Sequence, residues 1–128
     1  MTCTSLKSGM ASSGVFVSAQ FSSAGTINAT AEDSVAANNS GAGFVAFSPT
    51  GQSPTNLLVV RSVSSNNGTG LFASGAAATL RVGQSTVTGN TTNSWSTFNG
   101  GVLRSYGDNN IDGNFDGDPV NPTTIAKK

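Results

Sequence analysis

The chain has 128 residues, of which only 9% are charged, and six basic residues balance six acidic ones. We therefore expect neither nucleic acid nor a membrane surface as a partner, because the charge needed to attract either is missing. The sequence has no His, which excludes imidazole-based catalysis and the commonest metal ligand, and its single Cys excludes an internal disulfide or a multi-Cys zinc site.

Small polar residues dominate the chain, since Ser, Thr, Asn and Gly together account for 63 of its 128 residues. The low charge and the 36% of hydrophobic residues argue against disorder and favour one all-β domain with many turns. The first residues lack the apolar stretch of a signal peptide, and the longest strongly apolar run, residues 57–60, cannot span a membrane. Localisation stays open, and the chain is expected to be secreted or at the cell surface if it is a segment of a longer protein.

Four successive segments of the chain share one plan. Each opens with a Gly followed by apolar residues, and each later contains a β-branched residue, two small or polar residues and an Asn. The segments are 14–42, 43–69, 70–100 and 101–118, followed by a tail at 119–128. Their opening glycines are Gly14, Gly43, Gly70 and Gly101.

Between these two signals lies a third short β-rich stretch in three of the segments, at 26–28, 57–60 and 79–82. Each period therefore holds about three strands that are too short to bury an apolar face alone. Stacking successive periods, with each strand pairing with its equivalent in the next period, solves this problem. The repeat predicts a solenoid of four to five coils.

The aliphatic-x-x-Asn units and the Gly-apolar openings resemble the right-handed parallel β-helix of the pectate-lyase-like superfamily, in the style of bacterial β-helix repeat proteins. The resemblance covers roughly residues 14–116 and implies an all-β right-handed parallel β-helix that forms a single domain over residues 1–128.

The alignment of the four units predicts two stacks of equivalent residues. One is a buried aliphatic file formed by Val35, Val63, Val87 and Ile111. The other is a corner ladder of amides, which Asn favours because it tolerates left-handed backbone and bonds to its own copies. Its expected members are Asn38, Asn66, Asn90 and Asn114.

The facing of the Gly-led strand in the last coil is open. If Val102 points inward, alternation also brings Arg104 inward, whereas a shift by one residue buries Leu103 instead. Two further stretches, 48–54 and 91–99, are expected to leave the coil as loops. The aromatic residues of the second, Trp95 and Phe98, are expected to cap the core.

Acidic residues cluster near the end of the chain. The stretch 112–117 matches the first half of an EF-hand calcium loop, with Asp112, Asn114 and Asp116 as weak candidate calcium ligands. The twelfth position of that loop is Thr123 instead of Glu, and no helix is expected on either side. The alternative is that this is a set of ordinary Asp- and Asn-rich turns.

The resemblance implies clustered Asp with an Arg or Lys base in lyases, and a His-containing motif in hydrolases. The absence of His rules out the hydrolase pattern. Glu32 and Asp33 are expected on opposite faces of a strand, and only Arg104 is expected near an acid, Asp108. No catalytic residue is therefore assigned.

The function predicted is a non-catalytic structural or surface β-helix module. The alternative is a carbohydrate-binding or polysaccharide-degrading module, for which Trp95, Tyr106 and the Asp cluster are the candidate groove residues. The partner predicted is a second copy, through exposed coil ends. Residues 115–125 are expected to cover the C-terminal end, and residues 1–13 to leave the N-terminal end poorly protected.

Overall fold

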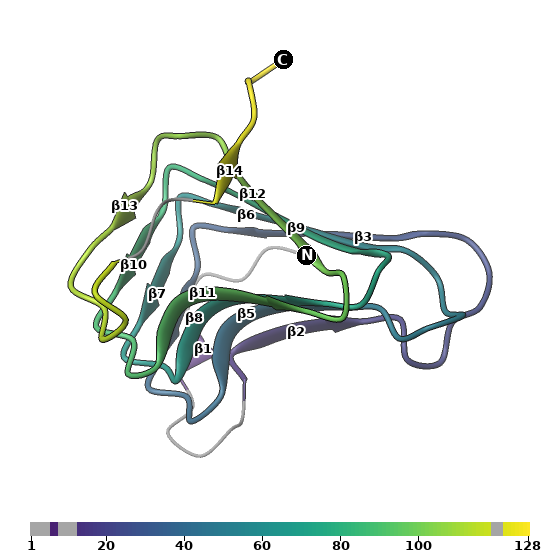
Figure 1. The fold of residues 1–128 in the computed structure, drawn as a ribbon, viewed down its shortest axis with the longest axis horizontal. Helices are drawn as coiled ribbons and strands as arrows, with labels where there is room; N and C mark the ends of the chain where they lie inside the picture. Colours follow the sequence, from purple (N-terminus) through teal and green to yellow (C-terminus); the bar gives the residue numbers. More distant parts are fainter. Residues whose placement is uncertain (1–5, 8–12, 119–121) are drawn as a thin grey trace.

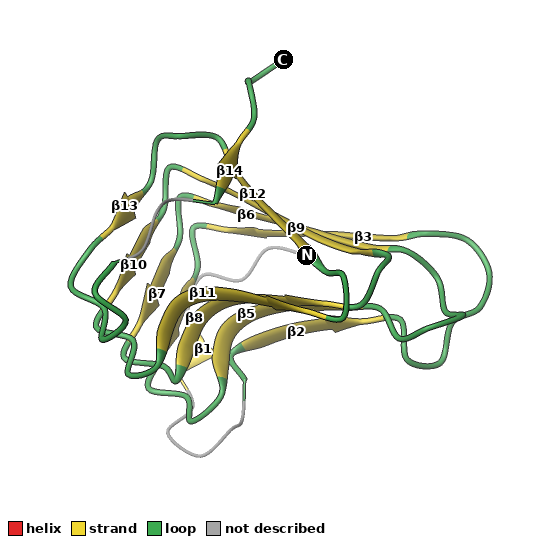
Figure 2. Ribbon diagram, in the orientation of Figure 1, coloured by secondary structure: helices red, strands yellow, loops and turns green. Residues whose placement is uncertain are grey.

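The structure is a computed structural model that describes residues 6–7, 13–118 and 122–128. Over these residues the chain forms strands and turns and no helix, as Figure 2 shows. The strands build three parallel sheets, and each of about four turns contributes one strand to each sheet. The predicted all-β parallel solenoid is confirmed.

The three sheets form the sides of the coil seen in Figure 1. Sheet A is the short side and contains, in order, β1 (Leu6–Lys7), β4 (Val35–Ala37), β7 (Val63–Ser65), β10 (Thr86–Thr88) and β13 (Asn110–Ile111). Sheet B contains β2 (Val15–Ser18), β5 (Ala42–Phe47), β8 (Thr69–Ser74) and β11 (Asn93–Phe98). Sheet C contains β3 (Ile27–Glu32), β6 (Thr55–Val60), β9 (Ala78–Gly83), β12 (Val102–Ser105) and β14 (Thr123–Thr124).

The core lies between sheets B and C and is made of files of equivalent side chains. Strand alternation turns every second residue inward, and parallel pairing in register places like residues on top of one another. Sheet B contributes the file Val15, Phe44, Leu71 and Trp95. Sheet C contributes the file Ala29, Leu57, Leu80 and Leu103. The inward position of Leu103 settles the open register of β12, and Arg104 lies on the outer face.

The amide ladder exists, but its first two members are not the predicted ones. The buried amides are Asn39, Asn67, Asn90 and Asn114. Asn39 Nδ2 donates to Asn67 Oδ1 at 2.8 Å, the backbone N–H of Asn67 donates to Asn90 Oδ1 at 3.0 Å, and Asn90 Nδ2 donates to Asn114 Oδ1 at 2.8 Å.

The prediction was wrong for Asn38 and Asn66, which are exposed and adopt left-handed backbone with φ of 62° and 55°. Gly89 and Gly113 hold this place in the next two coils, with φ of 65° and 71°. The corner thus requires a residue that tolerates positive φ, followed by the Asn of the ladder. The predicted alignment used the first Asn of the pairs 38–39 and 66–67, although the second Asn of each pair is the ladder residue. The first two coils were therefore aligned one residue out of register with the other two.

The same shift misplaced two members of the predicted aliphatic file. Val35 pairs with Val63, and Val63 pairs in turn with Thr86 of the next coil. This file faces outward. Val35 is exposed and Val63 is half-buried. The inward file is Ala36, Ser64, Val87 and Ile111. Only Val87 and Ile111 occupy the predicted file, and Ile111 is half-buried at its end.

Small residues are needed in sheet A because sheet B begins very close to it. A Cβ on Gly43 would lie 2.2 Å from Ser64 Oγ, and a Cβ on Gly70 would lie 2.5 Å from a methyl carbon of Val87. This close approach explains the Gly at the start of the first three sheet B strands, β2, β5 and β8. In the fourth coil Ser94 pairs at this place, whereas Gly101 precedes β12 of sheet C, so its assignment to the Gly series was wrong.

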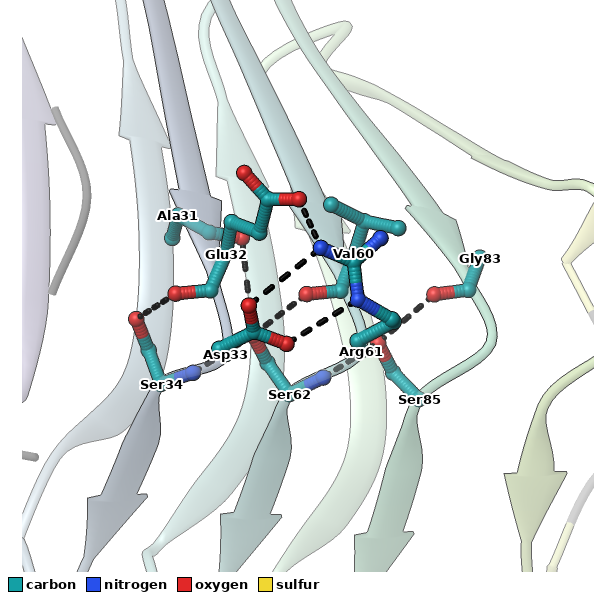
Figure 3. Close-up of polar contacts among 9 residues, drawn as sticks. All are labelled: Ala31, Glu32, Asp33, Ser34, Val60, Arg61, Ser62, Gly83 and Ser85. Atoms are coloured by element: carbon teal, nitrogen blue, oxygen red, sulfur yellow. Dashed lines mark hydrogen bonds and ion pairs between the residues drawn. The ribbon is translucent and has the colours of Figure 1, made fainter. Parts of the chain in front are cut away.

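A second polar ladder runs along the corner between sheets C and A (Figure 3). The backbone N–H of Ser34 donates to Ser62 Oγ at 3.2 Å, and that of Ser62 donates to Ser85 Oγ at 3.1 Å. The backbone N–H of Ser85 donates to Asn109 Oδ1 at 2.9 Å. All three serines are buried, so these bonds satisfy groups that water cannot reach. Among the residues described, none forms a helix long and apolar enough to cross a membrane.

Candidate functional site

A groove of about 850 Å³ lies on the outer face of sheet C, beside the C-terminal segment that leaves β14 in Figure 1. The sheet contributes outward residues from three successive turns, and the tail contributes one wall. The lining residues are Leu58, Val60, Arg81, Gly83, Gln84, Arg104, Tyr106, Ile125, Ala126, Lys127 and Lys128. We name this feature the basic groove, because four of the six cationic residues of the chain line it.

Arg81 and Arg104 lie directly opposite each other on neighbouring strands, β9 and β12. Both side chains point outward, because the residues that flank them in each strand are buried in the core. Parallel strands are about 4.8 Å apart, so the two Arg side chains leave the sheet next to each other. Neither forms an ion pair with a residue that the structure describes.

Tyr106 and Leu58 give the groove an apolar element next to its cations. Tyr106 follows β12 and packs over Gly83, where an added Cβ would lie 2.9 Å from the Tyr ring. Leu58 pairs with Arg81 across β6 and β9 and is half-buried. The groove can therefore hold a ligand that combines anionic groups with a carbon skeleton.

Asp108 is the partner of the groove residue Lys127, with 2.5 Å between Lys127 Nζ and Asp108 Oδ2. The hydrogen bond from Lys127, followed by one from the backbone N–H of Gln84, lowers the pKa of Asp108. Arg104 was the expected neighbour of this acid, and the structure gives that place to Lys127. The other cations of the groove, Arg81, Arg104 and Lys128, form no ion pair with any described carboxylate.

Arg61 forms a separate cluster with two acids of the preceding coil (Figure 3). Its guanidinium contacts the carboxylates of both Glu32 and Asp33, with 3.0 Å between Arg61 Nε and Asp33 Oδ1. The prediction that the two acids face opposite ways was wrong, because Asp33 has φ of 48° and ends the strand alternation. All three side chains are substantially exposed, so the cluster ties two coils together at the surface and adds little to stability.

The candidate calcium residues lie in one loop, but their oxygens are directed at donors of the chain itself. Asn114 Oδ1 accepts from the backbone N–H and Nδ2 of Asn90. Asp116 Oδ2 accepts from the backbone N–H and Oγ of Ser94, at 2.6 and 2.9 Å. Asp112 Oδ1 accepts from the backbone N–H of Gly113.

These oxygens already accept hydrogen bonds from the turns of the chain itself, and calcium binding stays a prediction. Among the described residues, no three His, Cys, Asp or Glu side chains gather as a metal ion would require. The hydrogen bonds of Asp116 and Asp118 lie in the last coil of the solenoid, and they are of the kind found in turns rich in Asp and Asn.

Of the two stretches expected to leave the coil as loops, 48–54 does lie between strands, whereas most of 91–99 is a strand of the coil itself. Residues 93–98 are strand β11 of sheet B, and residues 48–54 form the turn between β5 and β6. Trp95 packs inward against the core, as expected of a cap, whereas Phe98 points outward and is 61% exposed. Alternation along β11 separates the two rings, and Phe98 was wrongly assigned to the cap.

Four phenylalanines gather on the outer face of sheet B. Phe16 and Phe98 are its most exposed members and lie on the first and last strands, with Phe47 and Phe72 between them. The rings of Phe16 and Phe47 lie 5.9 Å apart between centroids. This outer apolar face and the basic groove are the two surface features that sequence analysis missed. Period-two alternation of β9 and β12 would have placed Arg81 and Arg104 together, had the strands been aligned with each other.

The fold defines the class of protein as a parallel β-solenoid. In comparisons with family models, with characterised proteins and with solved structures, no match to this chain is found.

Proposed function

We propose that the chain is a non-catalytic structural or surface β-solenoid module. The observation that supports this most strongly is that all six carboxylates accept hydrogen bonds or ion pairs from the chain itself. Glu32 and Asp33 join coils through Arg61, and Asp108 holds Lys127. The other three carboxylates, at the C-terminal end, accept hydrogen bonds from backbone N–H groups. They belong to Asp112, Asp116 and Asp118. A carboxylate used in this way is not free to act as a general acid or base.

Membership of the pectate-lyase-like superfamily is part of this proposal. Three-stranded turns with an Asn at one corner support it. The test of the non-catalytic role is incubation with polyuronates and neutral polysaccharides, measuring reducing ends and the absorbance of unsaturated products. We expect no turnover above buffer. Turnover that disappears in Asp108→Asn or Arg104→Gln, with the fold intact, would show instead that the groove is an active site.

We further propose that the module pairs with a second copy through its N-terminal coil end. The two ends of the amide ladder differ. Asn114 is closed by Asp118 at the C-terminal end, whereas no described residue donates to Asn39 Oδ1 at the N-terminal end, an atom that is itself out of reach of a second copy. The outer edges of β2 and β3 are also unpaired among the described strands. An end-to-end contact of identical surfaces gives a closed dimer. Most of residues 1–13 lie outside the described part of the chain.

Sedimentation across a dilution series of the whole chain tests this dimer, with Phe16→Lys and Phe98→Lys as matched variants. Both residues point outward from sheet B, but Phe16 is on the N-terminal edge strand and Phe98 on the C-terminal one. We expect Phe16→Lys to raise the dimer dissociation constant at least tenfold and Phe98→Lys to leave it unchanged. Equal weakening by both would assign the contact to the outer face of sheet B, and a monomer at all concentrations would end the proposal.

A further inference from the structure

The outer face of sheet C carries two neighbouring arginines that have no acidic partner among the described residues. Arg81 and Arg104 are direct cross-strand neighbours on the outer face of sheet C. Like charges placed directly opposite each other in a sheet are destabilising. Two other cations do have partners, since Arg61 meets Glu32 and Asp33, and Lys127 meets Asp108. The unpaired guanidinium pair is therefore a local departure from the way this molecule places its charges.

The surroundings of the pair are those of a binding site. The groove that contains both Arg side chains has a volume of about 850 Å³, enough for a ligand of several rings or a short chain. Half-buried Leu58 and Val60 form an apolar floor, and Tyr106 lies at one side. Lys128 adds a further cation at the wall formed by the tail.

From this geometry we propose that the basic groove binds a ligand carrying at least two oxyanion groups, with one group bridging Arg81 and Arg104. A guanidinium presents a planar fork of N–H donors that matches the oxygens of carboxylate, sulfate and phosphate. One oxyanion between two such forks replaces their repulsion with two charge-assisted interactions. The second anionic group reaches Lys128, and the carbon skeleton between the groups lies against Leu58 and Tyr106. This inference goes beyond the structural role, because the solenoid needs no ligand to close its coils.

The test is calorimetric titration of the whole chain with four probes, namely citrate, pyrophosphate, inorganic sulfate and uncharged glucose. Citrate and pyrophosphate each carry at least two oxyanion groups, so comparing them separates carboxylate from phosphate, while sulfate is the control with a single oxyanion. We expect citrate or pyrophosphate to bind at least tenfold more tightly than sulfate, because only they present two anionic groups. Glucose should not bind.

Variant Arg81→Gln/Arg104→Gln removes the pair while keeping side-chain length, and Arg61→Gln is the matched control, because Arg61 lies outside the groove. We expect the double variant to weaken binding at least tenfold and Arg61→Gln to change it less than twofold. The double variant should unfold at no lower a temperature than the parent, because it relieves a repulsion. NMR shifts on titration should concentrate at residues 81, 104 and 106.

Three results would overturn the assignment. The first is that none of the three anions binds to the parent protein. The second is an equal loss in Arg61→Gln, which would mean that only the overall charge matters. The third is a set of shifts spread away from residues 81, 104 and 106. None of these outcomes bears on the non-catalytic role or on the dimer, which the other two experiments test.

Discussion

Asp118 Oδ1 accepts hydrogen bonds from both the backbone N–H and the Nδ2 of Asn114, at 2.9 and 3.0 Å. Asn114 Oδ1 accepts the same two bonds from Asn90, at 3.1 and 2.8 Å. Asp118 therefore takes the place that the Asn of a further coil would occupy. The chain reaches it by turning back through Gly117 and Asp118, both with positive φ, so the amide ladder is completed from within the fourth coil.

The closure by Asp118 predicts a dependence of stability on pH. The hydrogen bonds from the backbone N–H and then the side chain of Asn114 lower the pKa of Asp118 below its ordinary value of 3.8. A carboxyl group with a lowered folded-state pKa stabilises the fold above its unfolded pKa, and this contribution is lost as pH falls through the folded value. We expect the melting temperature to fall on acidification below about pH 4, with Asp108 contributing in the same direction.

Two substitutions at Asp118 separate charge from hydrogen bonding. Asp118→Asn keeps an oxygen acceptor and should lose part of the acid sensitivity while folding normally. Asp118→Ala leaves the Asn114 donors without this acceptor and should melt lower at pH 7, by a margin that shrinks as acid protonates the carboxylate of the parent. Thermal melts monitored by circular dichroism from pH 2 to 7 give all three curves. Parallel curves for Asp118→Ala and the parent would show that the carboxylate does not close the ladder.

The shifted ladder predicts opposite outcomes for neighbouring asparagines. Asn67 is buried, and its Nδ2 donates to the carbonyl oxygen of Ala36 at 2.9 Å, while its Oδ1 accepts from Asn39. Asn67→Ala strands several buried polar groups and should lower the free energy of unfolding by about 3–5 kcal/mol. Asn66→Gly, at an exposed position with positive φ, should change it by less than about 1 kcal/mol.

Urea denaturation of both variants measures the difference. Similar losses for the two would return the ladder to the register that places Asn66 inward. A loss only in Asn66→Gly would mean that the left-handed corner, and not the buried amide, holds the coils together.

The outline of the fold could be predicted from the sequence because period and alternation are local signals. Gly14, Gly43 and Gly70 recur with the coil, since each faces a sheet too close for a side chain. The register of sheet A could not be fixed in the same way. Asn38 and Asn39 have the same side chain, and only the backbone conformation distinguishes the exposed one from the buried one. The Gly-Asn pairs at 89–90 and 113–114 held the missing signal, because Gly marks the residue of positive φ.

The candidate site was harder to predict because it depends on contacts between coils. Arg81 and Arg104 are 23 positions apart and meet only when β9 and β12 pair in register. The Asp residues near the chain end match both a calcium loop and a set of turns, because the same oxygens suit a cation and a backbone N–H equally well. Which of the two they meet depends on the donors left unpaired at the last coil, such as the backbone N–H of Ser94.

Val63 and Val87 provide a direct test of which residues of sheet A face inward. Val87 is 1% exposed and packs in the core, whereas Val63 is half-buried on the outer file. Val87→Asp places an unpaired charge in the core and should prevent folding or lower the free energy of unfolding by about 3 kcal/mol or more. Val63→Asp should lower it by about 1 kcal/mol, since the carboxylate reaches water. Urea denaturation that found Val63→Asp as damaging as Val87→Asp would restore Val63 to the core.

The turn after β8 predicts that one glycine cannot be replaced while another can. Gly75 has φ of 105°, and an added Cβ would lie 1.7 Å from the carbonyl oxygen of Ser48 in the coil below. Neither backbone can give way easily, because Gly75 N–H donates to the carbonyl oxygen of Phe98 and Ser48 N–H to that of Ser74, both at 2.9 Å. Gly75→Ala should therefore prevent folding or lower the free energy of unfolding by about 4 kcal/mol or more.

Gly51, in the preceding turn, also has positive φ, of 80°, but a Cβ there would meet nothing within 4 Å. Gly51→Ala should lower the free energy only by the backbone strain, about 1–2 kcal/mol. Urea denaturation of the two variants isolates the clash between coils from the strain of positive φ. Equal losses would mean that the coils at this corner are farther apart than the stacking of Gly75 on Ser48 requires.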